Sequence, residues 1–132
     1  MIVVDTTVWV DFLNGRDTRQ VGRLVDLIET DAGVALTDLV LAEVLQGIRD
    51  ESQVQLVDDR LGAFDVLRLD GLDDFRRAAA LYRQARRRGL TIRRTADCLI
   101  ASVCVREQLP LLHNDADFER LASCTPLMID RW

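Results

Sequence analysis

Two acidic residues of this 132-residue chain follow short apolar runs that are typical of buried strands. Asp5 comes directly after Ile2-Val3-Val4, and Asp115 comes shortly after Leu111-Leu112. In an open parallel sheet, ligands bind in the crevice outside the carboxyl ends of the strands. We therefore expect the Asp5 and Asp115 carboxylates to lie at one edge of one sheet.

Two further acids lie within apolar helical patterns. Glu43 is flanked on both sides by Leu, Ala and Val, and Asp97 opens the run Cys98-Leu99-Ile100-Ala101. A lone ionised carboxylate in such surroundings costs several kcal/mol unless it is compensated. Each acid also has a purely structural interpretation. Asp5 would then be a turn residue, Asp115 a helix cap, and Asp97 a first-turn acid that interacts with the helix dipole.

Four carboxylates gathered in one crevice would repel one another. At a separation of about 4 Å and an effective dielectric constant of about 20, each like-charged pair costs about 4 kcal/mol. From the sequence we expect that only a bound cation makes this arrangement favourable. Oxygen ligands without His or Cys favour a hard cation, Mg²⁺ or Mn²⁺. A metal-bound water in such a site suits hydrolysis of a phosphodiester.

The elements that must position these acids alternate along the chain. Strands are predicted at 2–4, 34–36, 64–69, 111–112 and 127–129, and helices at 7–13, 21–28, 38–47, 54–61, 72–88, 95–107 and 118–122. Strands that alternate with helices predict parallel βαβ units, and wholly apolar strands predict a sheet that is covered on both faces. The expected fold class is α/β: one domain over residues 1–132, a three-layer α/β/α sandwich around a short-stranded, mainly parallel sheet.

Composition narrows the class of protein further. With 48% apolar and 30% charged residues, 7 Gly and 2 Pro, the chain does not resemble a disordered or low-complexity protein. No apolar stretch approaches the ~20 residues of a membrane span, and the first residues lack a basic signal region. We expect a cytoplasmic protein without a membrane partner.

The net charge of −5 argues against a protein that coats nucleic acid by bulk electrostatic attraction. Three cysteines without a Cys-x-x-Cys pair are expected to be reduced thiols.

The order of the four acids resembles that of PIN-domain ribonucleases, and most closely the VapC toxins of bacterial toxin–antitoxin systems. The opening Ile2 to Val10 looks like the strand that runs into Asp-Thr-Ser/Thr in that branch. The segment Thr95 to Ala101 is similar to the family's third acidic motif, and His113 to Phe118 is similar to its fourth. The resemblance covers essentially the whole chain.

This resemblance implies a PIN-like domain and an endoribonuclease that depends on Mg²⁺, with Mn²⁺ as a substitute. Such an enzyme cuts single-stranded regions of RNA, often tRNA or rRNA, by a metal-activated water, and arrests translation. Asp5, Glu43, Asp97 and Asp115 carry over as the catalytic and metal-binding acids, with Asp117 as a further metal-binding acid. Thr7 and Asn114 are expected to support Asp5 and Asp115. The resemblance also implies a VapB-type antitoxin partner and a homodimer.

Basic and aromatic residues supply candidate partner surfaces. Arg86, Arg87, Arg93 and Arg94 are candidate RNA-binding residues, since arginine suits phosphate recognition; the alternative is a solvated helix end. Trp9, Phe12, Leu13 and Leu41 are candidates for an antitoxin groove, with core packing as the alternative. His113, the single histidine, lies beside Asp115, but packing at the strand end explains it better than a general-base role.

Two other classes of protein compete with the ribonuclease interpretation. A phosphatase with a nucleophilic Asp5 would need Asp-x-Asp after the first strand, whereas position 7 is Thr. A non-catalytic α/β interaction module is the broader alternative. Its phosphate-loop versions are disfavoured because neither Gly-x-Gly-x-x-Gly nor Gly-x-x-x-x-Gly-Lys occurs.

Overall fold

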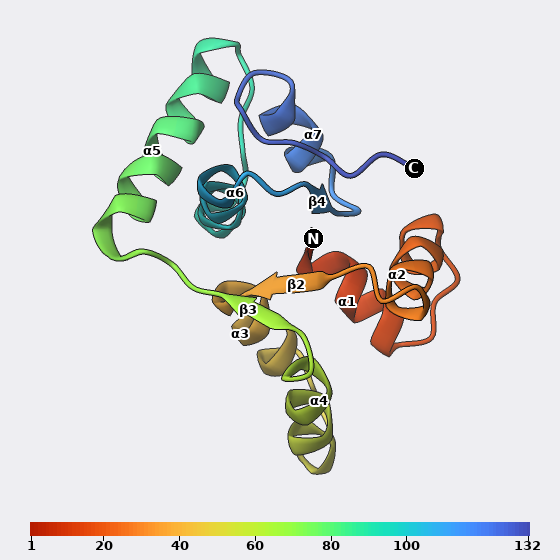
Figure 1. Cartoon of the computed structure of the whole chain (residues 1–132). Coiled ribbons are helices and arrows are strands. Elements are labelled where there is room, and N and C mark those ends of the chain that lie inside the picture. Colours follow the sequence, from red (N-terminus) through yellow and green to blue (C-terminus); the bar gives the residue numbers. More distant parts are fainter.

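A four-stranded sheet lies at the centre of the computed structural model, which describes residues 1–132 (Figure 1). Its strands are β1 (Ile2–Val4), β2 (Val34–Thr37), β3 (Asp65–Leu67) and β4 (Leu111–Leu112). Their order across the sheet is β3-β2-β1-β4, and all three pairings are parallel. The predicted α/β class with a parallel sheet is confirmed, and all the strand carboxyl ends point to one edge.

Helices cover both faces of this sheet. The helices are α1 (Thr6–Leu13), α2 (Arg19–Glu29), α3 (Asp38–Gln46), α4 (Val54–Leu61), α5 (Gly71–Arg87), α6 (Thr95–Glu107) and α7 (Ala116–Ala122), with a 3-10 turn η1 (Glu51–Gln53) before α4. In Figure 1, α3 and α4 lie next to β2 and β3, α1 and α2 lie to the right of them, and α5 to α7 lie around the end of the sheet at β4. The helices also pack on one another, α1 on α2 and α3, α5 on α6 and α7, and α3 on α6. This is the expected three-layer arrangement.

Local chemistry explains where the helices begin at the functional edge. Asp5 is the N-cap of α1 and Thr37 that of α3, and each side chain accepts a hydrogen bond from a first-turn amide. Asp115 caps α7 in the same way. Strand β1 and α1 are separated by Asp5 alone, so the cap also fixes that carboxylate at the end of β1.

Three details differ from the sequence-based expectation. The predicted strand over 127–129 is reduced to a single parallel bridge between Ile129 and Leu111, so the sheet has four strands. Strand β3 is shorter than predicted, since only Asp65 to Leu67 pair with β2. The sequence favours Thr95 as the cap of the helix predicted at 95–107, but Thr95 is the first helical residue of α6, and Arg94 stands at the N-cap position without a side-chain cap hydrogen bond.

No helix combines the length and the apolar character that crossing a membrane would demand.

Candidate active site

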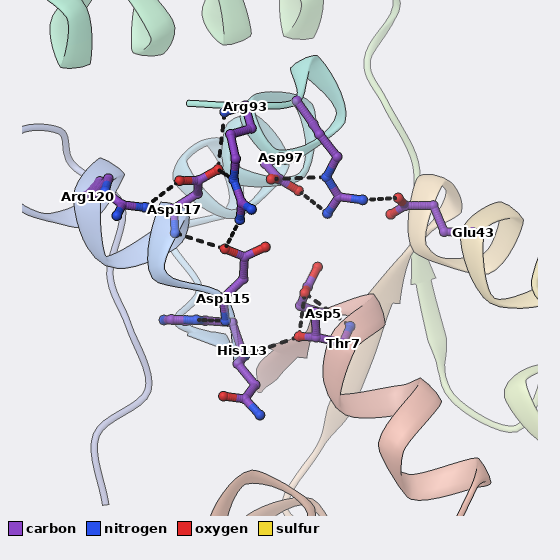
Figure 2. Close-up of polar contacts among 11 residues, drawn as sticks. Asp5, Thr7, Glu43, Arg93, Asp97, His113, Asp115, Asp117 and Arg120 are labelled. Carbon is purple, nitrogen blue, oxygen red and sulfur yellow. Dashed lines mark hydrogen bonds and ion pairs between the residues drawn. The ribbon is translucent and has the colours of Figure 1, made fainter. Parts of the chain in front are cut away.

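Asp5 is held at the end of β1 by a short chain of hydrogen bonds (Figure 2). Its Oδ2 accepts from the Thr7 hydroxyl at 2.7 Å and from the Thr7 amide at 3.2 Å. The Thr7 oxygen in turn accepts from the backbone amide of Asn114 at 3.1 Å. Thr7 therefore orients Asp5, and it also ties β1 to the β4–α7 loop. The other Asp5 oxygen, Oδ1, is buried and has no hydrogen-bond partner.

Glu43 and Asp97 come from different helices and share one arginine. The Arg94 guanidinium donates to Asp97 Oδ1 at 2.8 Å and to Glu43 Oε2 at 3.5 Å. Glu43 also accepts from the Thr6 hydroxyl at 2.8 Å. Asp97 is fully buried in the first turn of α6. Arg94 thus spans the crevice between α6 and α3.

Asp115 and Asp117 are connected through a second arginine. Arg93 donates from Nη2 to Asp115 at 3.0 Å, and from Nε and its backbone amide to Asp117 at 3.0 and 3.1 Å. The remaining Asp117 oxygen accepts from Arg120 at 2.6 Å. Both oxygens of this buried carboxylate are therefore engaged by arginine. Asp117 thus positions the loop that carries Arg93, and its role as a further metal-binding acid stays a prediction.

The carboxylates in the crevice titrate differently because their surroundings differ. Burial raises the pKa of Asp5, and the Thr7 hydrogen bonds only partly oppose it. Burial also raises the pKa of Asp97 to about 6, against the effect of Arg94 and with the help of the charges on Asp5 and Asp115. For Asp117, burial is outweighed by the Arg93 and Arg120 hydrogen bonds, so its pKa is lowered. Burial therefore disfavours the charged forms of Asp5 and Asp97, and arginine outweighs it only at Asp117.

A bound metal ion is not the only source of positive charge for these acids, although arginine does not offset the burial of Asp5 and Asp97. Arg93 and Arg94 supply positive charge from within the chain, and no three of the acidic side chains converge closely enough to hold one ion as they stand. The donor set nevertheless fits a hard cation. It consists of carboxylate oxygens, and the buried Asp5 Oδ1 lacks any donor. In Figure 2 the carboxylates of Asp5, Asp97 and Asp115 face the same space.

His113 is occupied within the protein. Its Nδ1 accepts from the Asp115 amide at 3.0 Å, and its Nε2 lies 3.0 Å from Glu119. With Nδ1 accepting, Nε2 is the nitrogen that donates. The ring also packs on Phe118, with centroids 5.3 Å apart. The packing interpretation of His113 is therefore supported.

The candidate RNA-binding arginines fall into two groups. Arg93 and Arg94 lie within the acidic cluster, with guanidinium groups that are paired to carboxylates and still largely exposed. Arg86 and Arg87 lie in the last turn of α5, where Arg86 stacks on Tyr82. The structure therefore brings only the first pair to the acids.

Of the four candidates for an antitoxin groove, one lines a groove and one is in the core. Trp9 is 1% exposed, and its indole donates a hydrogen bond to the Val4 carbonyl at 3.1 Å. The prediction that Trp9 contacts the antitoxin in a surface groove is therefore wrong. Phe12 packs against it edge to face. Leu13 lines a groove of about 560 Å³ between α1, α3 and α4. Leu41 is half-buried and is not among the residues that line that groove.

Two residues of this site were not singled out from the sequence. Thr6, which binds Glu43, gives no signal, since its partner is 37 positions away. Arg120 could have been found, because it lies three residues after Asp117, and residues at that spacing are neighbours on a helix.

Comparison with known proteins adds independent information. A family model described as the PIN domain matches residues 2–123. The chain is 35% identical over 130 residues to VapC ribonuclease Mb1587 of Mycobacterium bovis and to ribonuclease VapC11 of Mycobacterium tuberculosis, with 96% of both chains covered in each case. It is 28% identical over 121 residues to ribonuclease VapC1 of Methanocaldococcus jannaschii, covering 91% of this chain and 80% of the relative.

Solved structures show the same fold at lower identity. The VapBC2 complex of Rickettsia felis, bound to a DNA fragment from its promoter, matches with a TM-score of 0.78 and 22% identity over 100% of this chain and 99% of that one. VapC20 of Mycobacterium tuberculosis, described as a sarcin-ricin loop cleaving toxin, matches with a TM-score of 0.68 and 17% identity over 96% and 98% of the two chains.

Proposed function

The chain belongs to the PIN-domain family, among the VapC ribonucleases, and from this membership we propose that it is the endoribonuclease toxin of a bacterial toxin–antitoxin pair. The observation that carries the proposal is the acidic crevice at the carboxyl ends of β1 and β4. There Asp5, Asp97 and Asp115 face one space, and the buried Asp5 Oδ1 has no donor. We propose tRNA or rRNA as the substrate, cut in a single-stranded region.

The residues that would hold a divalent cation are Asp5, Asp97 and Asp115, with Glu43 at the far side of the crevice. Mg²⁺ or Mn²⁺ bound there would supply an activated water and stabilise the charge that develops on the phosphate. The chain's own contribution is orientation. Thr7 fixes one Asp5 oxygen and leaves the other free, and Asp117 holds Arg93 beside Asp115.

Arg93 and Arg94 are the residues placed to meet an RNA phosphate. Both side chains lie at the rim of the crevice, and each guanidinium binds a carboxylate. A guanidinium has five N–H donors, so each arginine keeps donors that a phosphate could use. A cation in the crevice would compete with Arg94 for Asp97 and Glu43, which would free its donors for phosphate. Arg86 and Arg87 remain candidates for a more distant part of the RNA backbone.

Two alternatives have less support from the site. An Asp-nucleophile phosphatase lacks a second acid beside Asp5, since Thr7 occupies that place and donates to the carboxylate. A non-catalytic module gives no reason for a buried carboxylate oxygen without a donor.

Cleavage of RNA by the purified protein tests this function directly. We expect it to cut a single-stranded RNA in Mg²⁺ or Mn²⁺ and to stop in EDTA, because the donor set is entirely carboxylate. Gel analysis of end-labelled RNA is the measurement, with the metal restored after chelation as the control. Equal cleavage in excess EDTA would contradict the metal-dependent mechanism.

The antitoxin is proposed to bind the groove between α1, α3 and α4. Its lining includes Val10, Leu13, Val44 and Ile48 together with the exposed Leu56. This groove runs beside α3, which carries Glu43, so a bound segment that extends along α3 beyond the groove would approach the acidic crevice. An exposed apolar groove of this kind suits an amphipathic helix. The homodimer implied by the resemblance stays a prediction.

Replacing Leu13 by Glu should abolish binding of a co-expressed antitoxin, because a charge would be buried in the apolar interface. Candidate antitoxins are the short DNA-binding proteins encoded by neighbouring genes. Co-purification is the measurement, and Leu72→Glu, at an exposed position of α5, is the matched control. Retained co-purification of the folded Leu13→Glu protein would place the antitoxin elsewhere.

A further inference from the structure

A polar cavity of about 350 Å³ adjoins the acidic crevice and shares Asp115 with it. It lies between the β4–α7 loop, the first turn of α2 and the last residues of the chain. We propose that this cavity binds a nucleobase of the RNA substrate, next to the phosphodiester that faces the acidic cluster. The inference rests on the proposed ribonuclease function and adds a specific subsite to it.

The wall that the C-terminal residues contribute is fixed by the rest of the protein. Asp130 accepts two hydrogen bonds from Arg23, at 2.9 and 3.1 Å, and its amide donates to the Leu111 carbonyl at 2.9 Å. Arg131 donates to both oxygens of Glu119, at 3.0 and 2.7 Å. The two residues before Trp132 are therefore bound to α2, β4 and α7, so the cavity has a defined shape.

Trp132 presents a large aromatic surface at this cavity. Its side chain is 47% exposed, whereas Trp9 is buried in the core. The Arg19 guanidinium lies 5.2 Å from the centre of the Trp132 ring, within the range of a cation–π contact, which orients the ring. An exposed ring of this kind is a platform on which a base can stack, and stacking tolerates any of the four bases.

The remaining lining supplies polar groups for the edge and the phosphate of a nucleotide. The carboxamides of Gln20 and Asn114 both donate and accept hydrogen bonds, as base edges require. Arg19 adds positive charge on the same side. The volume lies within the range of small-ligand sites. Because Asn114 immediately precedes Asp115, a base held here belongs to a nucleotide beside the acids rather than to a distant part of the RNA.

Binding of single-stranded RNA in EDTA tests the subsite without cleavage. Anisotropy of a labelled oligoribonucleotide should show affinity that is about tenfold weaker or more for Trp132→Ala, and near wild type for Trp132→Phe, which keeps a ring for stacking. RNA should also quench the fluorescence of Trp132 in the wild-type protein. Phe75→Ala, at an exposed aromatic residue of α5, is the matched control and should bind as wild type.

The outcomes separate this inference from the ribonuclease function. If the wild-type protein cuts RNA with metal, but Trp132→Ala binds as well as wild type and RNA does not quench fluorescence, the subsite is overturned and the function stands. If the wild-type protein cuts no RNA but binding and quenching depend on Trp132, the function fails and the cavity still binds nucleotides. Equal losses in Trp132→Phe and Trp132→Ala would overturn stacking as its basis.

Discussion

Replacing Asp5 by Asn should reduce metal-dependent RNA cleavage by more than about a hundredfold. Loss of an indirect partner of a metal ligand already costs about 10–100-fold, and Asp5 is proposed as a direct ligand. The fold should survive, because Asn is as good an N-cap as Asp and its oxygen can accept from Thr7. Burial raises the pKa of Asp5, so removing its charge should not destabilise the metal-free protein. The rate of cleavage of an end-labelled RNA is the measurement.

A second readout distinguishes a metal ligand from a structural cap at this position. Wild type should gain about 2.7 kcal/mol of stability when free Mn²⁺ is a hundredfold above its dissociation constant, and Asp5→Asn should lose most of that gain. Asp11→Asn, at the other end of α1, is the matched control and should cleave and bind Mn²⁺ as wild type. If Asp5→Asn is stabilised by Mn²⁺ as much as wild type, Asp5 is not a ligand.

Replacing Asp74 by Ala should lower the free energy of unfolding by about 3 kcal/mol, or roughly 10 °C in melting temperature. Asp74 is fully buried and accepts from Arg77 at 2.6 Å, from Ser102 at 2.7 Å and from the Asp70 amide at 2.6 Å. Its loss removes the acceptor of the Ser102 hydroxyl and the Asp70 amide, and the charged partner of Arg77, where α5 packs on α6. Thermal unfolding at neutral pH measures the effect.

The pH dependence of this difference has a definite sign. Burial alone would raise the pKa of Asp74, but the Asp70 amide, Ser102 and the neighbouring arginines hold it below its usual value. The carboxylate therefore stabilises the folded state fully above the pKa of the unfolded chain, near 3.8, and this contribution is lost as the pH falls through the lower, folded-state value. The gap between wild type and Asp74→Ala should narrow only in acid.

Asp73→Ala is the matched control for this experiment. Asp73 is adjacent in sequence but 71% exposed, and its ion pair with Arg76 lies on the surface. Exposed pairs contribute about 0–1 kcal/mol, so the control should melt close to wild type. A loss at Asp73 as large as that at Asp74 would show that the helix-start charge, and not the buried network, is responsible.

Most of the helices and strands, and the sheet edge at which the acids gather, can be predicted from the sequence. Short apolar runs such as Ile2–Val4 and the helix caps at Asp5 and Thr37 depend on interactions with residues only a few positions away. Such features can therefore be predicted from short stretches of sequence. Parallel pairing then places the ends of β1 and β4 together, with the acids that follow them. The contact between Thr7 and Asp5 was likewise predictable from two positions of separation.

The compensation of the charges, and the exposure of one tryptophan and burial of the other, depend on contacts between segments that are distant in the sequence. Arg94 reaches Glu43 across 51 positions, and Arg93 reaches Asp115 across 22, so no local spacing signals these pairs. The sequence alone does not distinguish the two tryptophans. In the structure Trp9 is buried in the core, whereas Trp132 is exposed and lines a cavity. Burial and charge balance depend on which distant segments pack together, and that is set by the whole core rather than by any one segment.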